Sequence, residues 1–216
     1  MSFLRQIDLV DMNRLQSIGA TIIGCGSIGS FTAITLAKMG IGRLVLYDDD
    51  SVESHNIPNQ FFTRDDLGTN KAECTAKYCT SLSPHHIEVL PYPCRYVTDP
   101  LDTEIVICTP DNMDTRRQVF EMYKVNMYPQ VLIEARMGGE ILSVFSVPKD
   151  QYYDEYESYL NGVEDKELPC TARTIIYNVL MCSSLIGSLV KKFVNGEDLP
   201  FLISYSFKEN YYVMSK

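Results

Sequence analysis

The feature that most constrains this chain is a glycine-rich turn between an apolar run and a segment with helical periodicity. Residues 20–24 (ATIIG) are a short β-branched run, which predicts a buried parallel strand. Residues 24–29 are Gly-Cys-Gly-Ser-Ile-Gly, and apolar side chains then recur over 28–39 at the spacing of a helix packed on a sheet. Residues 43–48 (RLVLYD) predict the next strand, so this part of the chain predicts one βαβ unit.

The same turn has the chemistry of a nucleotide site. Gly24 and Gly26 permit a tight turn and a close backbone approach, and Ser27 and Gly29 open a helix whose amides can bind phosphate. Asp48 ends the following strand, where a carboxylate can accept the ribose hydroxyls. Strand, helix and acidic residue occur together, which favours nucleotide binding over a turn without a ligand. The pattern alone does not separate NAD from ATP.

The rest of the chain continues the alternation of strands and helices. Helices are expected over 71–82, 113–126 and 171–196, and strands over 87–93, 103–111, 130–147 (two, around Gly138-Gly139) and 201–214. The acidic, tyrosine-rich stretch 148–169 shows no apolar period and predicts a mobile crossover loop. The predicted fold class is therefore α/β and Rossmann-like: a mainly parallel sheet with helices on both faces and an antiparallel C-terminal part, in a single domain over 1–216.

Composition excludes several classes of partner. A chain of 216 residues with a formal charge of −9 can bury one sizeable core, but it lacks the basic surface that nucleic acid needs. No apolar run reaches the length of a membrane span, and the N-terminus shows no signal-peptide pattern, so we expect a cytoplasmic protein that binds no membrane. The seven cysteines include no C-x-x-C pair, so no structural zinc is expected.

Several ordered motifs resemble those of the ThiF/MoeB/HesA superfamily, the adenylyltransferases related to ubiquitin-activating enzymes. In the segment from residue 44, "LVLYDDDSVESHNIPNQFFTRDDLGTNKAE", the fitting positions are Asp48, Asp50, Val52, Asn56, Ile57, Gln60, Gly68 and Lys71. Upstream, "FLRQI" resembles the family's Arg-Gln-Ile and contains Arg5, and Gln16 matches a Gln before the first strand. Downstream, "ICTPDNMDTRR" resembles Asp-Asn-x-x-x-Arg at Asp111, Asn112 and Arg116, and Cys170 precedes the last helix as in relatives. The resemblance covers nearly the whole chain.

This resemblance implies ATP-dependent, Mg²⁺-assisted adenylation of the C-terminal carboxylate of a small ubiquitin-like or sulfur-carrier protein, or of a peptide. The products are an acyl-adenylate and pyrophosphate. By resemblance, Lys71 neutralises phosphate charge, Asp111 holds Mg²⁺ and Asp48 anchors the ribose. Asp50 is a secondary polar or metal-linked group, and Asn56 and Gln60 belong to the nucleotide site. A solvated helix-start lysine at 71 and a helix N-cap at 111 are the corresponding structural alternatives.

Two further residues carry more open expectations. By resemblance, Arg5 reaches the phosphates of a partner subunit, which implies a homodimer. The equally weighted alternative is that Arg5 forms a surface salt bridge. Cys170 forms a covalent adduct with the activated carboxylate in some relatives. The alternative role of Cys170 is that of a small apolar residue at the start of a buried helix. This structural role is slightly favoured over that of a nucleophile.

One position departs from the family pattern. Asn59 stands where relatives carry a triphosphate-binding arginine, and Arg64, five residues on, is the nearest cation that could replace it. The second hypothesis is therefore a nucleotide-binding pseudoenzyme or scaffold subunit of the same fold. An NAD-dependent oxidoreductase ranks last, because the glycine turn alone supports it.

Overall fold

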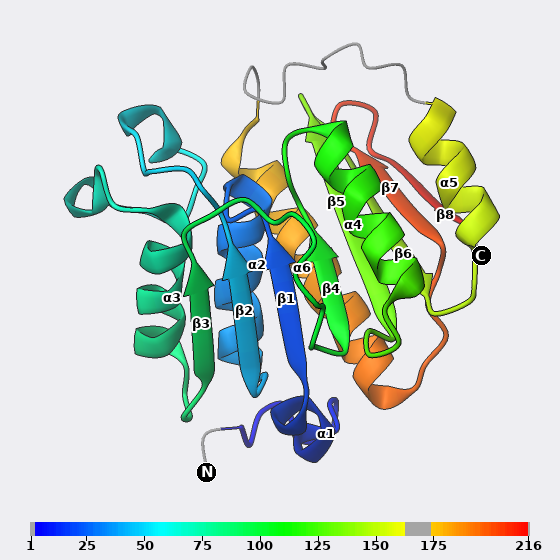
Figure 1. Ribbon diagram of the computed structural model, residues 1–216, viewed down its shortest axis with the longest axis horizontal. Helices are drawn as coiled ribbons and strands as arrows, with labels where there is room; N and C mark the ends of the chain where they lie inside the picture. Colours follow the sequence, from blue (N-terminus) through cyan, green and yellow to red (C-terminus); the bar gives the residue numbers. More distant parts are fainter. Residues whose placement is uncertain (1–2, 163–173, 216) are drawn as a thin grey trace.

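The protein is organised around one eight-stranded sheet, seen in a computed structural model that describes residues 3–162 and 174–215 (Figure 1). In spatial order the strands are β3 (Glu88–Tyr92), β2 (Arg43–Tyr47), β1 (Gly19–Ile23), β4 (Ile105–Cys108), β5 (Val131–Gly138), β6 (Ile141–Pro148), β7 (Leu202–Ser206) and β8 (Tyr211–Ser215). The first five are parallel, and β6, β7 and β8 add on antiparallel. The predicted fold class is confirmed, including the antiparallel C-terminal part.

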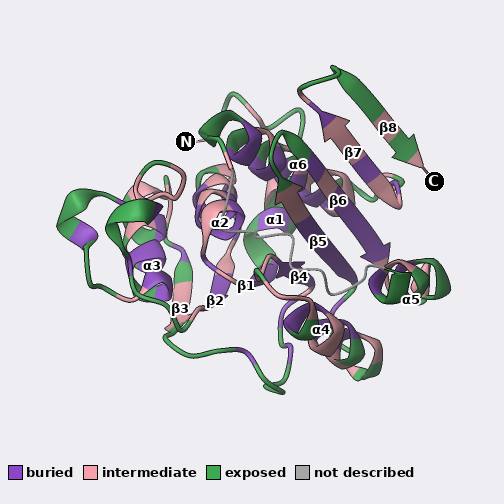
Figure 2. Ribbon diagram, turned by 90° about the horizontal axis from the view of Figure 1, so that it is seen from above, coloured by how far each residue is buried: buried purple, intermediate pink, exposed green. Residues whose placement is uncertain are grey.

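Helices cover both faces of the sheet (Figure 2). On one face lie α2 (Ser27–Met39), α3 (Lys71–Leu82) and α6 (Ile176–Asn195), and on the other lie α4 (Met113–Val125) and α5 (Tyr153–Gly162). The short α1 (Met12–Ser17) lies at the amino end of β1, and the connection between β2 and α3 contains two 3₁₀ turns, η1 (Ser54–Asn56) and η2 (Arg64–Asp66). No helix within the described residues is long and apolar enough to cross a membrane.

The central strands are apolar on both sides because each side faces helices. All five residues of β1 are buried, and neighbours along it join different cores: Ile22 packs in the core that contains residues of α2 and α6, and Ile23 in the core that contains residues of α4 and α5. Such strands appear in the sequence as continuous β-branched runs rather than as alternating ones. The register is in line across the sheet, with Ile23 beside Cys108 and Cys108 beside Glu134.

The sequence predicts a loop over 148–169. This prediction is wrong for the residues after β6 that the structure describes. Residues 153–162 form α5, with Tyr156 and Leu160 buried against the core. The helix was missed because aromatic rings, rather than an aliphatic period, form much of its inner face. The Tyr156 ring packs edge-on to that of Phe120 in α4, with their centroids 4.8 Å apart. The remainder, 163–169, lies outside the described residues.

Candidate functional site

The predicted nucleotide site lies at the carboxyl edge of the sheet, where β1, β2 and β4 end. Backbone hydrogen bonds fasten these three ends together: Gly24 N donates to Tyr47 O at 2.9 Å and Thr109 N to Ile23 O at 2.9 Å. The Thr109 hydroxyl also donates to Gly24 O at 2.8 Å. Because α2 leaves β1 on one face and α4 leaves β4 on the other, the crevice between these strands is a topological switch point, the usual ligand position in such sheets.

The three glycines of the turn have different reasons to be glycine. Gly24 has φ +93°, and a Cβ on Gly29 would lie 1.8 Å from Gly24 O, so the fold itself requires both. Gly26 is outside the left-handed region at φ −75°, and a Cβ there would meet nothing nearer than Gln60 Nε2 at 4.0 Å. Packing does not require Gly26, so the open space in front of it, beside the N-terminus of α2 and Ser27, fits a ligand.

Asp48 connects the end of β2 to the glycine turn. Its Oδ2 accepts from Cys25 N at 2.6 Å and its Oδ1 from Asp50 N at 2.9 Å. Burial raises the pKa of this carboxyl, and the hydrogen bonds and Lys71 only partly offset that effect. Each oxygen keeps a second lone pair, so the carboxylate can still accept two hydroxyl groups.

Lys71 and Asp50 form an ion pair at the same edge. Lys71 Nζ lies 2.7 Å from Asp50 Oδ2, with the lysine side chain 8% exposed and the aspartate 65% exposed. Asn70 caps the N-terminus of α3, accepting from the backbone of Ala72 and Glu73, and thereby fixes the first residue of the helix, Lys71. The structure therefore places a nearly buried ammonium at the end of β2, close to Asp48.

The amide-rich segment between β2 and α3 is partly structural. Asn56 is buried and its Oδ1 accepts from Glu53 N at 2.8 Å, so it caps η1. Gln60 lies over the glycine turn, and its buried Oε1 has no hydrogen-bond partner among the described residues. Arg64 is exposed in η2, and its side chain has no hydrogen bond or ion pair within the part of the chain that the structure describes. Asn59 is half-buried.

Asp111 follows β4 and is exposed, and the residues just before it, Thr109 and Pro110, lie against Gly24. Its neighbour Asn112, not Asp111 itself, caps α4 by accepting from Thr115 N at 2.8 Å, so the capping alternative for Asp111 does not hold. Asn112 also donates to Asp111 Oδ1 at 3.2 Å. Among the described residues, the carboxylates with ligand-like spacing are instead Asp48, Asp49 and Asp50, whose oxygens lie within 4.8 Å of one another. Either set has the hard oxygen donors that suit Mg²⁺.

A buried charge cluster beside β4 was not predicted from the sequence. Glu134 in β5 is fully buried and accepts from Arg116, from Arg136 and from the Tyr156 hydroxyl. Arg116 also donates to Pro110 O and to Ala135 O, which holds the chain just before Asp111. The signal in the sequence was the pair of charged residues, 134 and 136, inside the apolar run 131–137.

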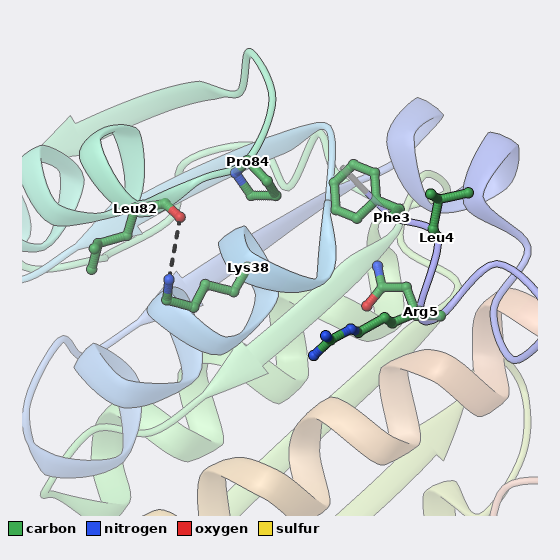
Figure 3. Close-up of a pocket in the computed structure, with 7 residues that line it drawn as sticks. Phe3, Leu4, Arg5, Lys38, Leu82 and Pro84 are labelled. Atoms are coloured by element: carbon green, nitrogen blue, oxygen red, sulfur yellow. Dashed lines mark hydrogen bonds between the residues drawn. The ribbon is translucent and has the colours of Figure 1, made fainter. Parts of the chain in front are cut away.

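The structure does not bring two of the predicted site residues, Arg5 and Cys170, together with those at the carboxyl edge of the sheet. Arg5 lies in an open groove of about 440 Å³ beside Lys38, in the last turn of α2, whereas the glycine turn is at the first turn (Figure 3). The length of α2 separates these ends by about 18 Å. The expectation for Arg5 concerned a partner subunit, so it stays a prediction. Cys170 lies outside the described residues.

Comparisons with known proteins agree with this architecture. The model of the ThiF family matches residues 1–214. Ubiquitin-like modifier-activating enzyme 5 of Drosophila willistoni is 38% identical over 82 residues, and that of Aedes aegypti 36% over 84 residues; these stretches are 38% and 39% of this chain but only 20% and 21% of those proteins.

Solved structures show the same fold at low identity. E. coli MccB with AMPCPP and selenomethionine MccA has a TM-score of 0.73 at 20% identity, and selenomethionine PaaA has 0.77 at 21%. Each comparison covers 95% of this chain and 65% of the other. With a family match over nearly its whole length and the expected turn, acidic residue and lysine at one edge of the sheet, the chain belongs to the ThiF family.

Proposed function

We propose that this protein uses ATP to adenylate the C-terminal carboxylate of a small ubiquitin-like or sulfur-carrier protein, or of a peptide, releasing pyrophosphate. The observation that carries the proposal is the hydrogen bond from Cys25 N to Asp48 Oδ2 at 2.6 Å. It holds the carboxylate proposed to bind ribose against the glycine turn proposed to bind phosphate. The relatives named as ubiquitin-like modifier-activating enzymes, and the structure of MccB with AMPCPP and MccA, support this class of reaction over dinucleotide chemistry.

The chain's own residues divide the work along the carboxyl edge. Asp48 accepts the ribose hydroxyls, and the amides at the start of α2 bind phosphate oxygens in the space in front of Gly26. Lys71 is held close to the site by Asp50 and supplies positive charge as negative charge builds on the leaving pyrophosphate. The Gln60 side chain lies over the glycine turn with its Nε2 toward Gly26, where this amide can donate to a phosphate oxygen of the nucleotide.

Asp111 is the proposed Mg²⁺ ligand, with Asp50 as a further oxygen donor on the other side of the glycine turn. When bound, Mg²⁺ would neutralise phosphate charge and favour departure of pyrophosphate. Asn112 and Arg116 fix the position of Asp111, through its side chain and through the carbonyl of Pro110 respectively.

The proposal extends to assembly and location. A homodimer in which Arg5 serves the partner subunit's phosphates explains an exposed arginine far from its own glycine turn. A covalent adduct on Cys170 after adenylation, and a cytoplasmic location, complete the proposed account.

A second function, a nucleotide-binding scaffold without adenylation, is favoured by one observation. Asn59 replaces a phosphate-binding arginine, and the candidate replacement Arg64 is exposed with no partner among the described residues to direct it toward the site.

ATP–pyrophosphate exchange separates these functions. Small carrier proteins encoded beside this gene, and peptides captured by the protein, are tested as acceptors with MgATP and labelled pyrophosphate. Adenylation predicts exchange that requires the acceptor and is lost in Lys71→Ala and Asp111→Ala, whereas the exposed-lysine control Lys77→Ala keeps it. ATP binding with no exchange for any acceptor supports the scaffold, and NADH binding with no response to ATP contradicts both.

A further inference from the structure

The carboxyl end of β5 carries a buried charge cluster with more positive than negative groups. Glu134 is 0% exposed and forms ion pairs with both Arg116 and Arg136. No other carboxylate pairs with either arginine in the described part of the chain. One carboxylate therefore faces two guanidinium groups, which leaves one unit of positive charge at a largely desolvated position. Such an excess is costly unless an anion is to be bound there.

Arg136 is the member of the cluster that can reach a ligand. Its Nε and one Nη donate to the two oxygens of Glu134 at 2.7 and 2.8 Å, and its other Nη has no partner among the described residues. The side chain is 17% exposed, and its guanidinium lies over the ring of Tyr159, 4.8 Å from the centroid. Burial opposes its charge, but Glu134 outweighs burial and raises the pKa of Arg136 above its ordinary value. The group is thus rigid, charged and open on one side.

Arg136 lies at the same edge of the sheet as the proposed nucleotide site. Glu134 is in register with Cys108, and Cys108 with Ile23, so Arg136 is level with the residues just after β4 and β1. Two strand spacings separate β5 from β1, about 10 Å, and an arginine side chain bridges much of that distance. Arg136 faces the helix layer of α4 and α5, on the β4 side of the crevice.

Charge along this edge changes sign from one end to the other. The β2 end has Asp48, Asp49 and Asp50 against Lys71 and Arg95, and the β4 end has exposed Asp111. A substrate carboxylate approaching from β2 would meet Asp48, Asp49 and Asp50, whereas approach over β5 meets an unpaired guanidinium donor before it reaches Asp111, the proposed Mg²⁺ ligand. Like charges at this range repel by about 1 kcal/mol or more, depending on exposure.

We propose that Arg136 binds the C-terminal carboxylate of the acyl substrate and directs it over β5 and β4 toward the nucleotide. This inference rests on the proposed function and adds to it the residue that recognises the second substrate. Lys71, on the β2 side, serves the phosphates, so the two anions are received by different cations. Glu134 is the positioning residue that holds Arg136 in place.

The test compares binding of glycylglycine with that of glycylglycine amide, which lacks the negative charge, to protein saturated with AMPCPP and Mg²⁺, by ligand-observed NMR titration. The wild type should bind the free carboxylate about five- to tenfold more tightly than the amide. Arg136→Gln should bring the ratio close to one without changing AMPCPP affinity, and Arg136→Lys should retain part of the preference. The matched control Arg95→Gln removes an exposed cation from the same edge and should keep the full ratio.

Arg136→Gln should fold, because Glu134 keeps Arg116 as its partner, and circular dichroism melting checks this. If it does not fold, Arg136→Lys still tests the inference through its lowered ratio. AMPCPP binding with no carboxylate preference, or a preference that survives in the Arg136 variants, overturns the role of Arg136 and leaves the proposed function standing. Failure of the wild type to bind AMPCPP overturns both.

Discussion

At the scale of single residues, the glycine turn separates what the fold needs from what a ligand needs. A Cβ at Gly29 would collide with Gly24 O at 1.8 Å, whereas a Cβ at Gly26 would meet only Gln60 Nε2 at 4.0 Å. The same residue type at two positions therefore serves two purposes, and substitution can distinguish them.

We predict that Gly29→Ala lowers the free energy of unfolding by about 3 kcal/mol, because the backbone must shift to admit the methyl group. Gly26→Ala should change stability by less than about 1 kcal/mol but weaken ATP binding about tenfold, because the methyl group fills the phosphate space. Chemical denaturation and calorimetric titration with MgATP measure the two effects. Equal loss of stability in both variants would contradict this assignment.

Asp48 should make nucleotide binding sensitive to acid. Its pKa is raised from the ordinary 3.8, so in the folded protein it takes up a proton at a higher pH than a solvated aspartate. The affinity for adenosine, whose hydroxyls need an acceptor, should therefore fall on acidification from a pH above that of an ordinary aspartate. Asp48→Asn should bind weakly at every pH and lose this dependence.

The stability of the ligand-free protein should respond to Asp48 in the opposite sense. A carboxyl with a raised folded-state pKa contributes most stability below its unfolded value of 3.8 and loses that contribution as the pH rises through the folded value. Comparing the pH dependence of unfolding of wild type and Asp48→Asn isolates this term. A wild-type curve that rises more steeply than the variant's in this window would refute the raised pKa.

At the scale of elements, the sequence predicted those with aliphatic periodicity and missed those without it. Helix α3 begins at Lys71 and ends at Leu82 as predicted, because Asn70 provides a cap and small apolar residues form one face. Helix α5 was predicted as loop, since Tyr153 and Tyr156 supply apolar surface that a charged, tyrosine-rich composition hides. Helix α1 is only six residues long and has a single buried side chain, Leu15, too little to give a period.

The site likewise contains residues that the sequence predicted and a cluster that it did not. Asp48, Lys71 and Asp111 were placed by motifs that follow strands in the sequence, and the carboxyl ends of parallel strands meet at one edge. The Glu134 cluster could not be assembled in advance, because its members come from β5, α4 and α5 and their contact depends on tertiary packing.

The packing of α5 is testable by truncation. Leu160→Ala should lower the free energy of unfolding by about 2–4 kcal/mol, because the side chain is 2% exposed, whereas exposed Ser158→Ala should be nearly neutral. Urea denaturation measures both. A mobile flap over these residues predicts no difference between the two variants.

At the scale of the whole molecule, the groove around Arg5 and the nucleotide site lie at opposite ends of α2. A site completed by a second subunit accommodates this separation. Mixing Arg5→Ala and Lys71→Ala subunits, each inactive alone, should then restore up to about a quarter of wild-type exchange, because half of the dimers contain one intact site of two. Absence of recovery in mixtures shown to exchange subunits would exclude the shared site.

The proposed activity of the whole molecule is activation of a carboxylate by transfer of AMP. It is tested most directly by incubating the protein and its acceptor with ATP radiolabelled at either the α- or the γ-phosphate, then following label into the acceptor. Adenylation predicts acceptor-bound label from α-labelled ATP alone, released by hydroxylamine and absent with Asp111→Ala. Acceptor-bound label from γ-labelled ATP, or none from either form in the Cys170→Ala variant despite ATP binding, would contradict it.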